Sequence, residues 1–178
     1  MNVASTMFRE RGYDRTSLDD IAKALSITKP SLYYHFPNKE EILLGCIEMG
    51  YNLFNEWIDE RDDERLSGRE RLAIFLTSYV ALLKDNVLSV LVADERVMSD
   101  IAKSRYRHYK RLLHDALVER LNAGEHDGTL KVRDARHVAF AIFGMINWMV
   151  NWPPKEIGRP TEEIAAQFLD LVLDGIAA

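Results

Sequence analysis

Signals that begin a helix recur along the whole of this sequence. A short polar residue with acids in the next three positions occurs at Ser17, Asn38, Ser67 and Thr161. Such a residue can satisfy the free backbone N–H groups of a first turn, and acids there interact favourably with the helix dipole. No convincing run of alternating polar and apolar residues, which would indicate a strand, is found. The sequence therefore predicts an all-α protein.

Glycine and proline mark where these helices end. Gly12 is expected to end the first helix, Gly124 and Gly128 a later one, and Pro153 with Pro154 the one before the last. We expect helices over about residues 2–11, 17–24, 28–36, 38–59, 67–84 and 102–122, one that starts at Asp134, and one that starts at Thr161.

Composition excludes several classes of protein. A chain of 178 residues with 47% hydrophobic and 29% charged residues is an ordinary globular sequence, long enough to bury a full core. Cys46 is the only cysteine, so a disulfide framework and a Cys-rich zinc site are excluded. No window could span a bilayer and no signal peptide begins the sequence, so we expect a cytoplasmic protein with no membrane partner.

The charge of the chain is unevenly distributed. The net charge is -5, but residues 1–47 carry six Lys or Arg and six acids, so the excess negative charge belongs to residues 48–178. Residues 21–39 contain three lysines and no acid. The net negative charge of the whole chain argues against a protein that coats nucleic acid indiscriminately, whereas the charge of residues 21–39 permits contact with DNA.

The stretch ITKPSLYYHFPNKEEIL, residues 27–43, has the aromatic residues of a strand between segments that are helical. A helix explains it if Thr28 is the N-cap, because Pro30 then lies in the first turn, where it removes no helical hydrogen bond. Leu32 and Phe36, four residues apart, would face inward. Together with residues 17–24 this helix predicts a helix-turn-helix. Its small core would be formed by Ile21, Ala22, Leu25, Ile27, Leu32 and Phe36 against Val3, Met7 and Phe8.

The outer side of this helix would present hydroxyls, a cation and an imidazole with no carboxylate to repel phosphates. The residues concerned are Thr28, Lys29, Ser31, Tyr33, Tyr34 and His35, and Lys39 adds a cation at the next helix start. Two other interpretations stay open at this point. Tyr33 and Tyr34 could pack on the first helix, and His35 could be a capping residue.

The segment FRERGYDRTSLDDIAKALSITKPSLYYHFPNKEEIL, residues 8–43, resembles the DNA-binding signature of the TetR family of bacterial transcriptional regulators. The resemblance implies a DNA-binding domain over 1–46 and a ligand-binding and dimerisation domain over 47–178. It implies phosphate contacts from Thr16, Ser17, Tyr33, Tyr34, His35 and Lys39, and positions near base edges for Thr28, Lys29, Pro30 and Ser31. Family members usually carry further, often basic, residues before the first helix, whereas this sequence begins at that helix, so the resemblance assigns no contacts to such an arm.

The larger segment is expected to form a helical bundle that dimerises. Residues 137–154, HVAFAIFGMINWMVNWPP, are apolar on nearly every side, so a helix here should be buried all round. This helix and the last helix of the chain would be buried by pairing with a second copy. The residues expected at that interface are Ala141, Gly144, Ile164, Phe168, Leu171, Val172 and Gly175. The alternative is that these residues belong to the core of one chain.

Aromatic and methionine side chains of the larger segment could line an adaptable apolar pocket, although each could equally be plain core. The candidates are Tyr79, Leu83, Met98, Tyr106, Tyr109, Met145, Trp148, Met149 and Trp152. The basic run KSRYRHYKR, residues 103–111, is either a solvated face or a receptor for an anionic ligand group.

No arrangement of histidines, serines or glycines indicates a metal site, a catalytic nucleophile or a bound cofactor, so we expect no enzyme. The sequence favours a homodimeric repressor that a small, largely apolar effector, such as an acyl-CoA, a fatty acid or an aromatic compound, releases from double-stranded operator DNA. The alternative is an all-helical ligand carrier or enzyme whose N-terminal three-helix segment is structural.

Overall fold

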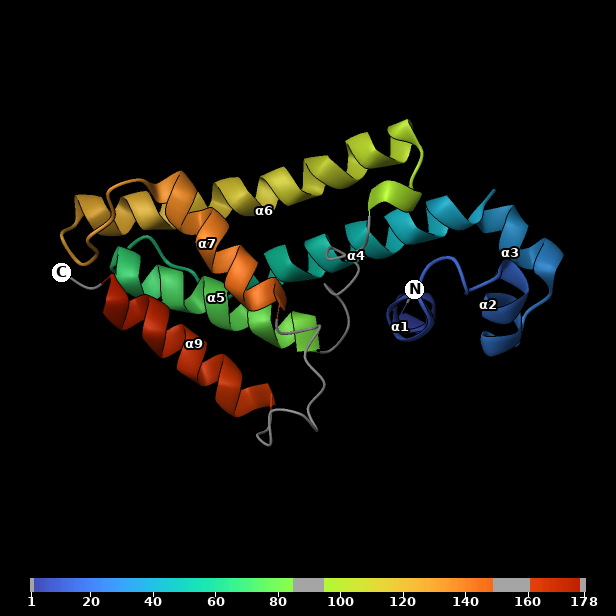
Figure 1. The fold of residues 1–178 in the computed structure, drawn as a ribbon, viewed down its shortest axis with the longest axis horizontal. Helices are drawn as coiled ribbons and strands as arrows, with labels where there is room; N and C mark the ends of the chain where they lie inside the picture. Colours follow the sequence, from blue (N-terminus) through green and yellow to red (C-terminus); the bar gives the residue numbers. More distant parts are fainter. Residues whose placement is uncertain (1, 85–94, 149–160, 177–178) are drawn as a thin grey trace. The chain divides into compact units, whose positions relative to one another are not determined.

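The computed structural model describes residues 2–84, 95–148 and 161–176. The chain divides into two compact units, which are described separately. Unit one contains residues 1–53 and 82–110, and unit two contains residues 54–81 and 111–178. Every regular element in the described ranges is a helix, which confirms the predicted fold class (Figure 1).

Unit one begins with α1 (Asn2–Arg11), α2 (Leu18–Ala24) and α3 (Lys29–His35), and α2 lies beside α3 (Figure 1). These short helices bury Met7 and Phe8 on α1, Ile21 and Ala22 on α2, and Leu32 on α3. Of the other predicted core residues, Leu25 and Phe36 are half-buried, whereas Val3 and Ile27 are 37% and 39% exposed. Each fully buried large apolar side chain contributes about 1.5–3 kcal/mol to folding. The predicted core is therefore confirmed for these buried residues and wrong for Val3 and Ile27, which lie at the surface, on α1 and in the turn before α3.

The turn between α2 and α3 reverses the chain over two residues. The N–H of Ile27 donates to the carbonyl of Ala22 and the N–H of Ser26 to the carbonyl of Lys23, both at 3.0 Å. This pair of bonds is a Schellman motif, whose central residue must adopt a left-handed conformation. Ser26 does so with φ of 55°, although glycine is usual there.

Two long helices, α4 (Lys39–Asp59) and α6 (Asp100–His126), supply residues to both units. A short 3-10 helix, η2 (Glu95–Val97), precedes α6. The bounds of α4 agree with the prediction, but α6 begins two residues earlier and ends four later than expected. It begins early because Ser99 acts as its cap, accepting from the N–H of Ala102.

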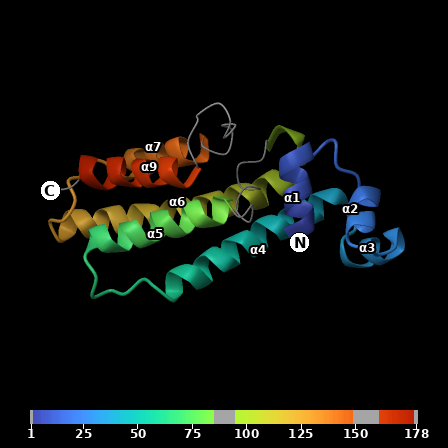
Figure 2. The ribbon, with the colours of Figure 1, turned by 90° about the horizontal axis from the view of Figure 1, so that it is seen from below.

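Unit two contains most of α5 (Gly68–Lys84), together with α7 (Ala135–Trp148) and α9 (Thr161–Gly175). α7 packs beside α9 (Figure 2). Ring contacts among Phe54, Phe75, Tyr79 and Phe143 form the aromatic centre of this unit. The predicted helix end at Pro153 and Pro154 lies outside the described residues.

The backbone of α5 touches the backbone of α6 near residues 68 and 124. A Cβ atom added to Gly68 would lie 2.0 Å from the backbone nitrogen of Gly124. The Gly68 N–H also donates to Asp127, and the Arg69 N–H donates to Thr129. Gly124 was expected to end α6, but it lies within the helix, where the space of its missing side chain is occupied by the side chain of Leu130. The helix ends at His126, and Gly128 lies in the turn that follows, with φ of 77°.

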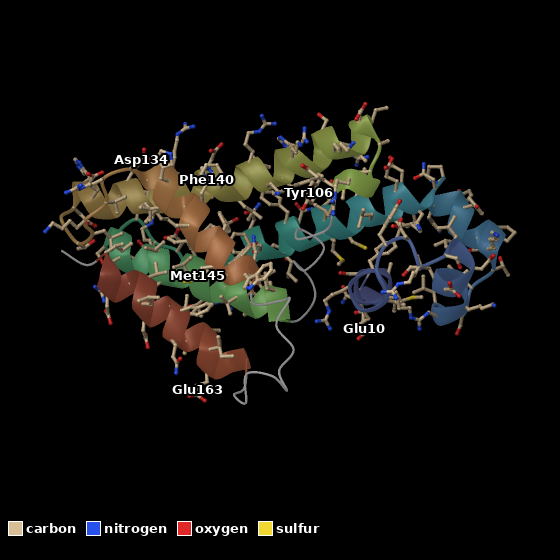
Figure 3. All side chains as sticks on the ribbon, in the orientation of Figure 1. Glu10, Tyr106, Asp134, Phe140, Met145 and Glu163 are labelled. Atoms are coloured by element: carbon tan, nitrogen blue, oxygen red, sulfur yellow. The ribbon has the colours of Figure 1, made fainter. Side chains whose placement is uncertain are left out.

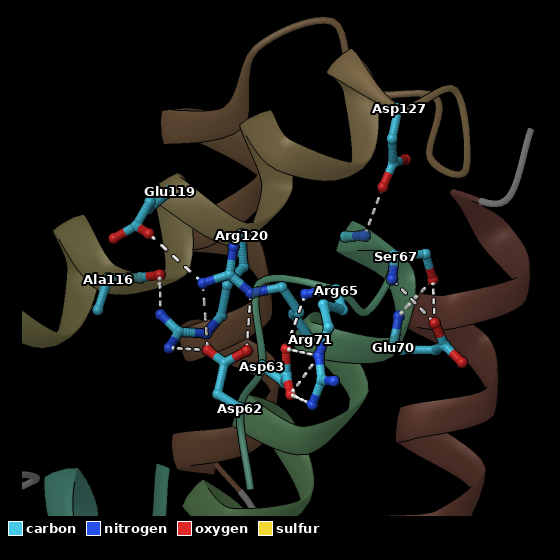
Figure 4. A network of polar contacts seen from close by, with 11 residues as sticks. Asp62, Asp63, Arg65, Ser67, Glu70, Arg71, Ala116, Glu119, Arg120 and Asp127 are labelled. Atoms are coloured by element: carbon cyan, nitrogen blue, oxygen red, sulfur yellow. Dashed lines mark hydrogen bonds and ion pairs between the residues drawn. The ribbon is translucent and has the colours of Figure 1, made fainter. Parts of the chain in front are cut away.

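A buried ion network joins the loop after α4 to α5 and α6 (Figure 4). Asp62 accepts from Arg71 and Arg120, and the side chains of Asp62 and Arg120 are each 8% exposed. Arg120 also donates to the carbonyl of Ala116. Burial alone would raise the pKa of Asp62, but the two guanidinium groups outweigh it and hold that pKa below its usual value.

The expectation that α7 is buried all round is wrong for a single chain. Ala135, Ala139, Ile142 and Ile146 face the core of unit two, whereas Phe140 on the opposite side is 65% exposed. Figure 3 labels Phe140 and Met145 on this helix. On this outward face Ala141 and Gly144 are also exposed, and the centre of the Phe140 ring lies 4.4 Å from the centre of the His114 ring on α6.

Candidate nucleic-acid interface

The start of α3 is built as the sequence predicts. The hydroxyl of Thr28, the N-cap, accepts from the N–H of Ser31 at 3.3 Å, and Pro30 lies in the first turn. Thr28, Lys29, Pro30 and Ser31 are all exposed. The four residues placed near base edges by the resemblance therefore share an accessible helix start.

The remainder of α3 presents its aromatic residues to solvent. Leu32 is buried, and half-buried Phe36 is the C-cap. Tyr33 and His35 are exposed, and Tyr34 is 86% exposed, with its ring edge against the His35 ring. Packing of Tyr34 on the first helix is excluded by this exposure. A phenol so placed can donate to a phosphate oxygen.

Lys39 has a structural contact that the sequence did not reveal. Its Nζ donates to the carbonyl of Tyr13 at 2.8 Å and lies 4.1 Å from the centre of the Tyr13 ring. Burial, followed by the nearby charges of Glu40 and Asp14, raises the pKa of Tyr13. Lys39 thus fixes the turn between α1 and α2, so its phosphate contact stays a prediction.

Thr16 and Ser17 differ in how they meet solvent. The Thr16 hydroxyl is buried and donates to the carbonyls of Met7 and Gly12. The Thr16 hydroxyl is therefore not among the exposed groups of the predicted interface, because it links α1 to the segment before α2. Ser17 is exposed and forms a complete capping box with Asp20, and these hydrogen bonds lower the pKa of Asp20.

An ion pair connects the two helices of the helix-turn-helix. Lys29 Nζ, at the first position of α3, donates to Asp19 Oδ2 on α2 at 2.9 Å. The segment 21–39 holds no acid in the sequence, yet the fold brings Asp19, two residues outside it, against its central lysine. From the sequence, this contact could be anticipated only through the prediction that the two helices pack together as a helix-turn-helix.

Carboxylates in the first turn of α4 bind the start of α6. Glu40 accepts from the N–H and the hydroxyl of Ser99, and Glu41 accepts from Arg105. Asn38 caps α4 by accepting from the N–H of Glu41. The helix that follows α3 is therefore attached to α6 within unit one.

These contacts change the interpretation of the basic run 103–111. Arg105 pairs with Glu41, Arg107 with Glu95 and Lys103 with Asp100, while Lys110 lies over the Tyr106 ring. Several of its cations thus already neutralise acids of the same unit, so a ligand anion would have to compete with them.

The candidate pocket residues divide between the units. Leu83, Met98 and Tyr106 are buried and Tyr109 is half-buried in unit one, whereas Tyr79 is buried and Met145 half-buried in unit two. Trp148 is exposed, and Met149 and Trp152 lie outside the described residues. The Tyr79 hydroxyl donates to Asn147, which accounts for this polar atom in the aromatic centre.

The candidate dimer residues divide between the core and the surface. Ile164 and Val172 are buried in the chain itself because they lie on the side of α9 that packs inward. Phe168 is half-buried. Exposed are Ala141, Gly144, Leu171 and Gly175, and the exposed Phe140, on the same helix as Ala141 and Gly144, was missed by the sequence analysis.

None of the described helices is both long and apolar enough to cross a bilayer. Two family models match the chain. Residues 1–46 match the bacterial regulatory proteins of the tetR family, and residues 65–176 match the tetracyclin repressor-like C-terminal domain. The second match alone covers more than half of the chain.

Relatives extend both matches. The chain is 32% identical over 148 residues, 81% of its length, to 72% of the biofilm operon icaADBC HTH-type negative transcriptional regulator IcaR of Staphylococcus epidermidis. It is 30% identical over its full length to 89% of the HTH-type transcriptional repressor KstR2 of Rhodococcus jostii. A solved structure of AibR in complex with isovaleryl coenzyme A and operator DNA is 26% identical, with a TM-score of 0.81 over 96% of this chain and 94% of that one. The chain belongs to the TetR family of bacterial transcriptional regulators.

Proposed function

We propose that this protein is a repressor that binds operator DNA through α3 and is released by a small, largely apolar ligand. The observation that carries the proposal is the exposed row on α3, from Thr28 through His35, in which hydroxyls, a cation and an imidazole occur without a carboxylate. Because a bacterial operator lies in the cytoplasm, that is where we place its action. Binding, and not catalysis, is the proposed activity.

Within the interface we assign two tasks. Tyr33, Tyr34, His35 and Ser17 hold phosphates, with Lys39 contributing a cation at the start of α4. Thr28, Lys29, Pro30 and Ser31 lie toward base edges in the major groove. Residues 1–46 form the DNA-binding domain in this proposal, and residues 47–178 bind ligand and dimerise.

We propose an acyl-CoA or a related apolar acid as the ligand. The support is the solved complex of AibR with isovaleryl coenzyme A and the supply of buried aromatic and sulfur-containing side chains in this chain. A ligand that binds one conformation of the regulator more tightly than the other shifts the equilibrium between them. A tenfold loss of operator affinity needs only about 1.4 kcal/mol of such differential binding.

TetR regulators are dimers, and we propose the outward side of α7 and α9 as the shared surface. Phe140 and Leu171 are more than 60% exposed, and Ala141, Gly144 and Gly175 leave room beside them. An isologous contact would bury both helices against their copies. Phe140→Asp with Leu171→Asp should give monomers in analytical ultracentrifugation. Ile101→Asp, at an equally exposed apolar residue of α6, should remain dimeric.

The test of DNA binding is a gel shift with the duplex upstream of the gene that encodes this protein. His35→Ala should weaken binding about tenfold for all sequences, since a phosphate contact carries no base information. His126→Ala removes another exposed histidine from the last position of a helix, α6, and should change nothing.

Repeating the gel shift with isovaleryl-CoA, fatty acids and aromatic acids would identify the class of effector. If no duplex is bound in a salt-dependent manner, the repressor proposal is wrong and a carrier or enzyme with a structural three-helix segment is favoured.

A further inference from the structure

The ion pair between Asp19 and Lys29 lies on the face that the proposed function turns toward DNA. Asp19 is in the first turn of α2, and Lys29 is the first residue of α3. Their side chains remain 53% and 46% exposed, and Nζ approaches Oδ2 to 2.9 Å. The hydrogen bond to Asp19, followed by its charge, raises the pKa of Lys29, so the lysine stays fully charged at neutral pH.

Stability of the fold does not explain this pair. Ion pairs between half-exposed side chains contribute little to folding because water and salt screen them. The helices of the motif are already held together by Ile21, Ala22 and Leu32, which are at most 3% exposed. Asp20, the neighbouring acid, is occupied by the capping box with Ser17. Asp19 lies in the first turn of α2, where an acid suits the helix dipole, but that interaction does not require a bond to Lys29.

A carboxylate at this position is costly for a protein that only needs to grip a polyanion. It neutralises Lys29, which would otherwise release counterions by pairing with a phosphate, and it repels phosphates itself. A carboxylate does have a suitable partner in the major groove, the N4 amino group of cytosine, while a lysine suits O6 and N7 of guanine. A G·C base pair offers both partners along a single edge.

We propose that Asp19 is a specificity-determining residue, which acts with Lys29 to read a G·C base pair in each half-site and reduces affinity for all other DNA. Lys29 donates to the guanine acceptors, and Asp19 accepts from the cytosine amino group while it orients the lysine. The inference rests on the proposed function, because it assumes that α3 enters the major groove.

The experiment is selection of bound sites from a pool of duplexes with a randomised central region. It compares the wild type with Asp19→Asn, which keeps the size of the side chain and removes its charge. Glu10→Gln is the matched control, since it removes one acid of the same unit from α1 (Figure 3), where Glu10 makes only a 3.9 Å contact with Arg9. Lys29→Met and the double variant complete a cycle that isolates the pair.

The wild type should enrich G·C at one position of each half-site. Asp19→Asn should lose about tenfold of that enrichment, bind the unselected pool about threefold more tightly, and show a steeper salt dependence by about one counterion per half-site. Glu10→Gln should retain the wild-type preference. In the Lys29→Met background, Asp19→Asn should change the salt dependence less than in the wild type, because only the direct repulsion between Asp19 and phosphates remains to be removed. Thermal unfolding should be the same for wild type and Asp19→Asn.

Two results would overturn the inference, and a third would overturn the proposed function on which it rests. Unchanged enrichment with unchanged affinity would show that Asp19 has no part in binding. Tighter binding of the unselected duplexes with unchanged enrichment would show that Asp19 only repels phosphates and does not read bases. Failure of the wild type to bind any duplex would instead overturn the proposed function.

Discussion

Arg105 on α6 donates through Nη1 to both carboxylate oxygens of Glu41 on α4, at 3.1 and 2.8 Å. Glu41 lies two residues after Lys39, which holds the turn between α1 and α2. The helix that follows the recognition helix is thus attached both to the three-helix segment and to α6. A ligand that displaced the start of α6 would act on this attachment.

Arg105→Ala should loosen the first turn of α4 without unfolding the protein, because the pair lies on the surface but joins two elements. Hydrogen exchange of the amides over residues 41–44 should become faster. Arg107→Ala removes a guanidinium that binds Glu95 instead of α4 and should leave that exchange unchanged. Equal exchange in both variants would mean that the ion pair does not hold α4.

Asp62→Asn should destabilise unit two by about 3 kcal/mol at pH 7, because it removes the counter-charge of buried Arg120 and leaves half-buried Arg71 with the exposed Glu119, 3.6 Å away. Urea unfolding measures this free energy. Asp63→Asn, at the neighbouring acid in an exposed pair with Arg65, should change it little.

The same variant should alter the dependence of stability on pH. The pKa of Asp62 is lowered in the folded state, so its contribution is complete above the unfolded pKa of about 4 and is lost as pH falls through the folded value. Wild-type stability should therefore decline on acidification more steeply than that of Asp62→Asn. Parallel curves would show that Asp62 has the same pKa in both states.

Ser26→Gly should raise the stability of the helix-turn-helix by up to about 1 kcal/mol. A left-handed conformation costs a residue with a Cβ atom about 1–2 kcal/mol, and glycine avoids this cost. The greater conformational freedom of glycine in the unfolded chain offsets part of the gain. Thermal unfolding is the measurement. Ser26→Val should lower the midpoint, since a β-branched side chain tolerates that conformation least.

Gly68→Ala should cost about 3 kcal/mol, because the added methyl group would meet the backbone of α6 and not the end of a flexible side chain. Ser67→Ala, one residue earlier, removes the helix cap formed with Glu70 and should cost only about 1 kcal/mol. A smaller loss for Gly68→Ala than for Ser67→Ala would mean that the two helices separate easily.

Local signals were sufficient for the helices and for the face of α3. Thr28, Pro30 and Leu32 lie within five residues, so their cap, first turn and inward position could be predicted without knowledge of the rest of the chain. The partner of Glu41 could not, since Arg105 is 64 positions away. The helix-start pattern around Glu41 and the basic run that contains Arg105 do not indicate that the two residues meet. Gly124 shows the converse error. Its conformational preference suggested a helix end, but it lies inside the helix, where the Leu130 side chain packs in the place of a Cβ atom.

The side chains of Lys29, Ser31 and Tyr34 are exposed, and the core beneath them is complete in Leu32, Ile21 and Phe8. Replacement of these three outer residues therefore leaves folding almost untouched, while Thr28 carries a cap worth about 1 kcal/mol. Single substitutions at these three positions could therefore change operator preference, in evolution or by design, without passing through a variant that fails to fold. On the proposed function, the outer face of α3 is consequently open to evolutionary change of specificity.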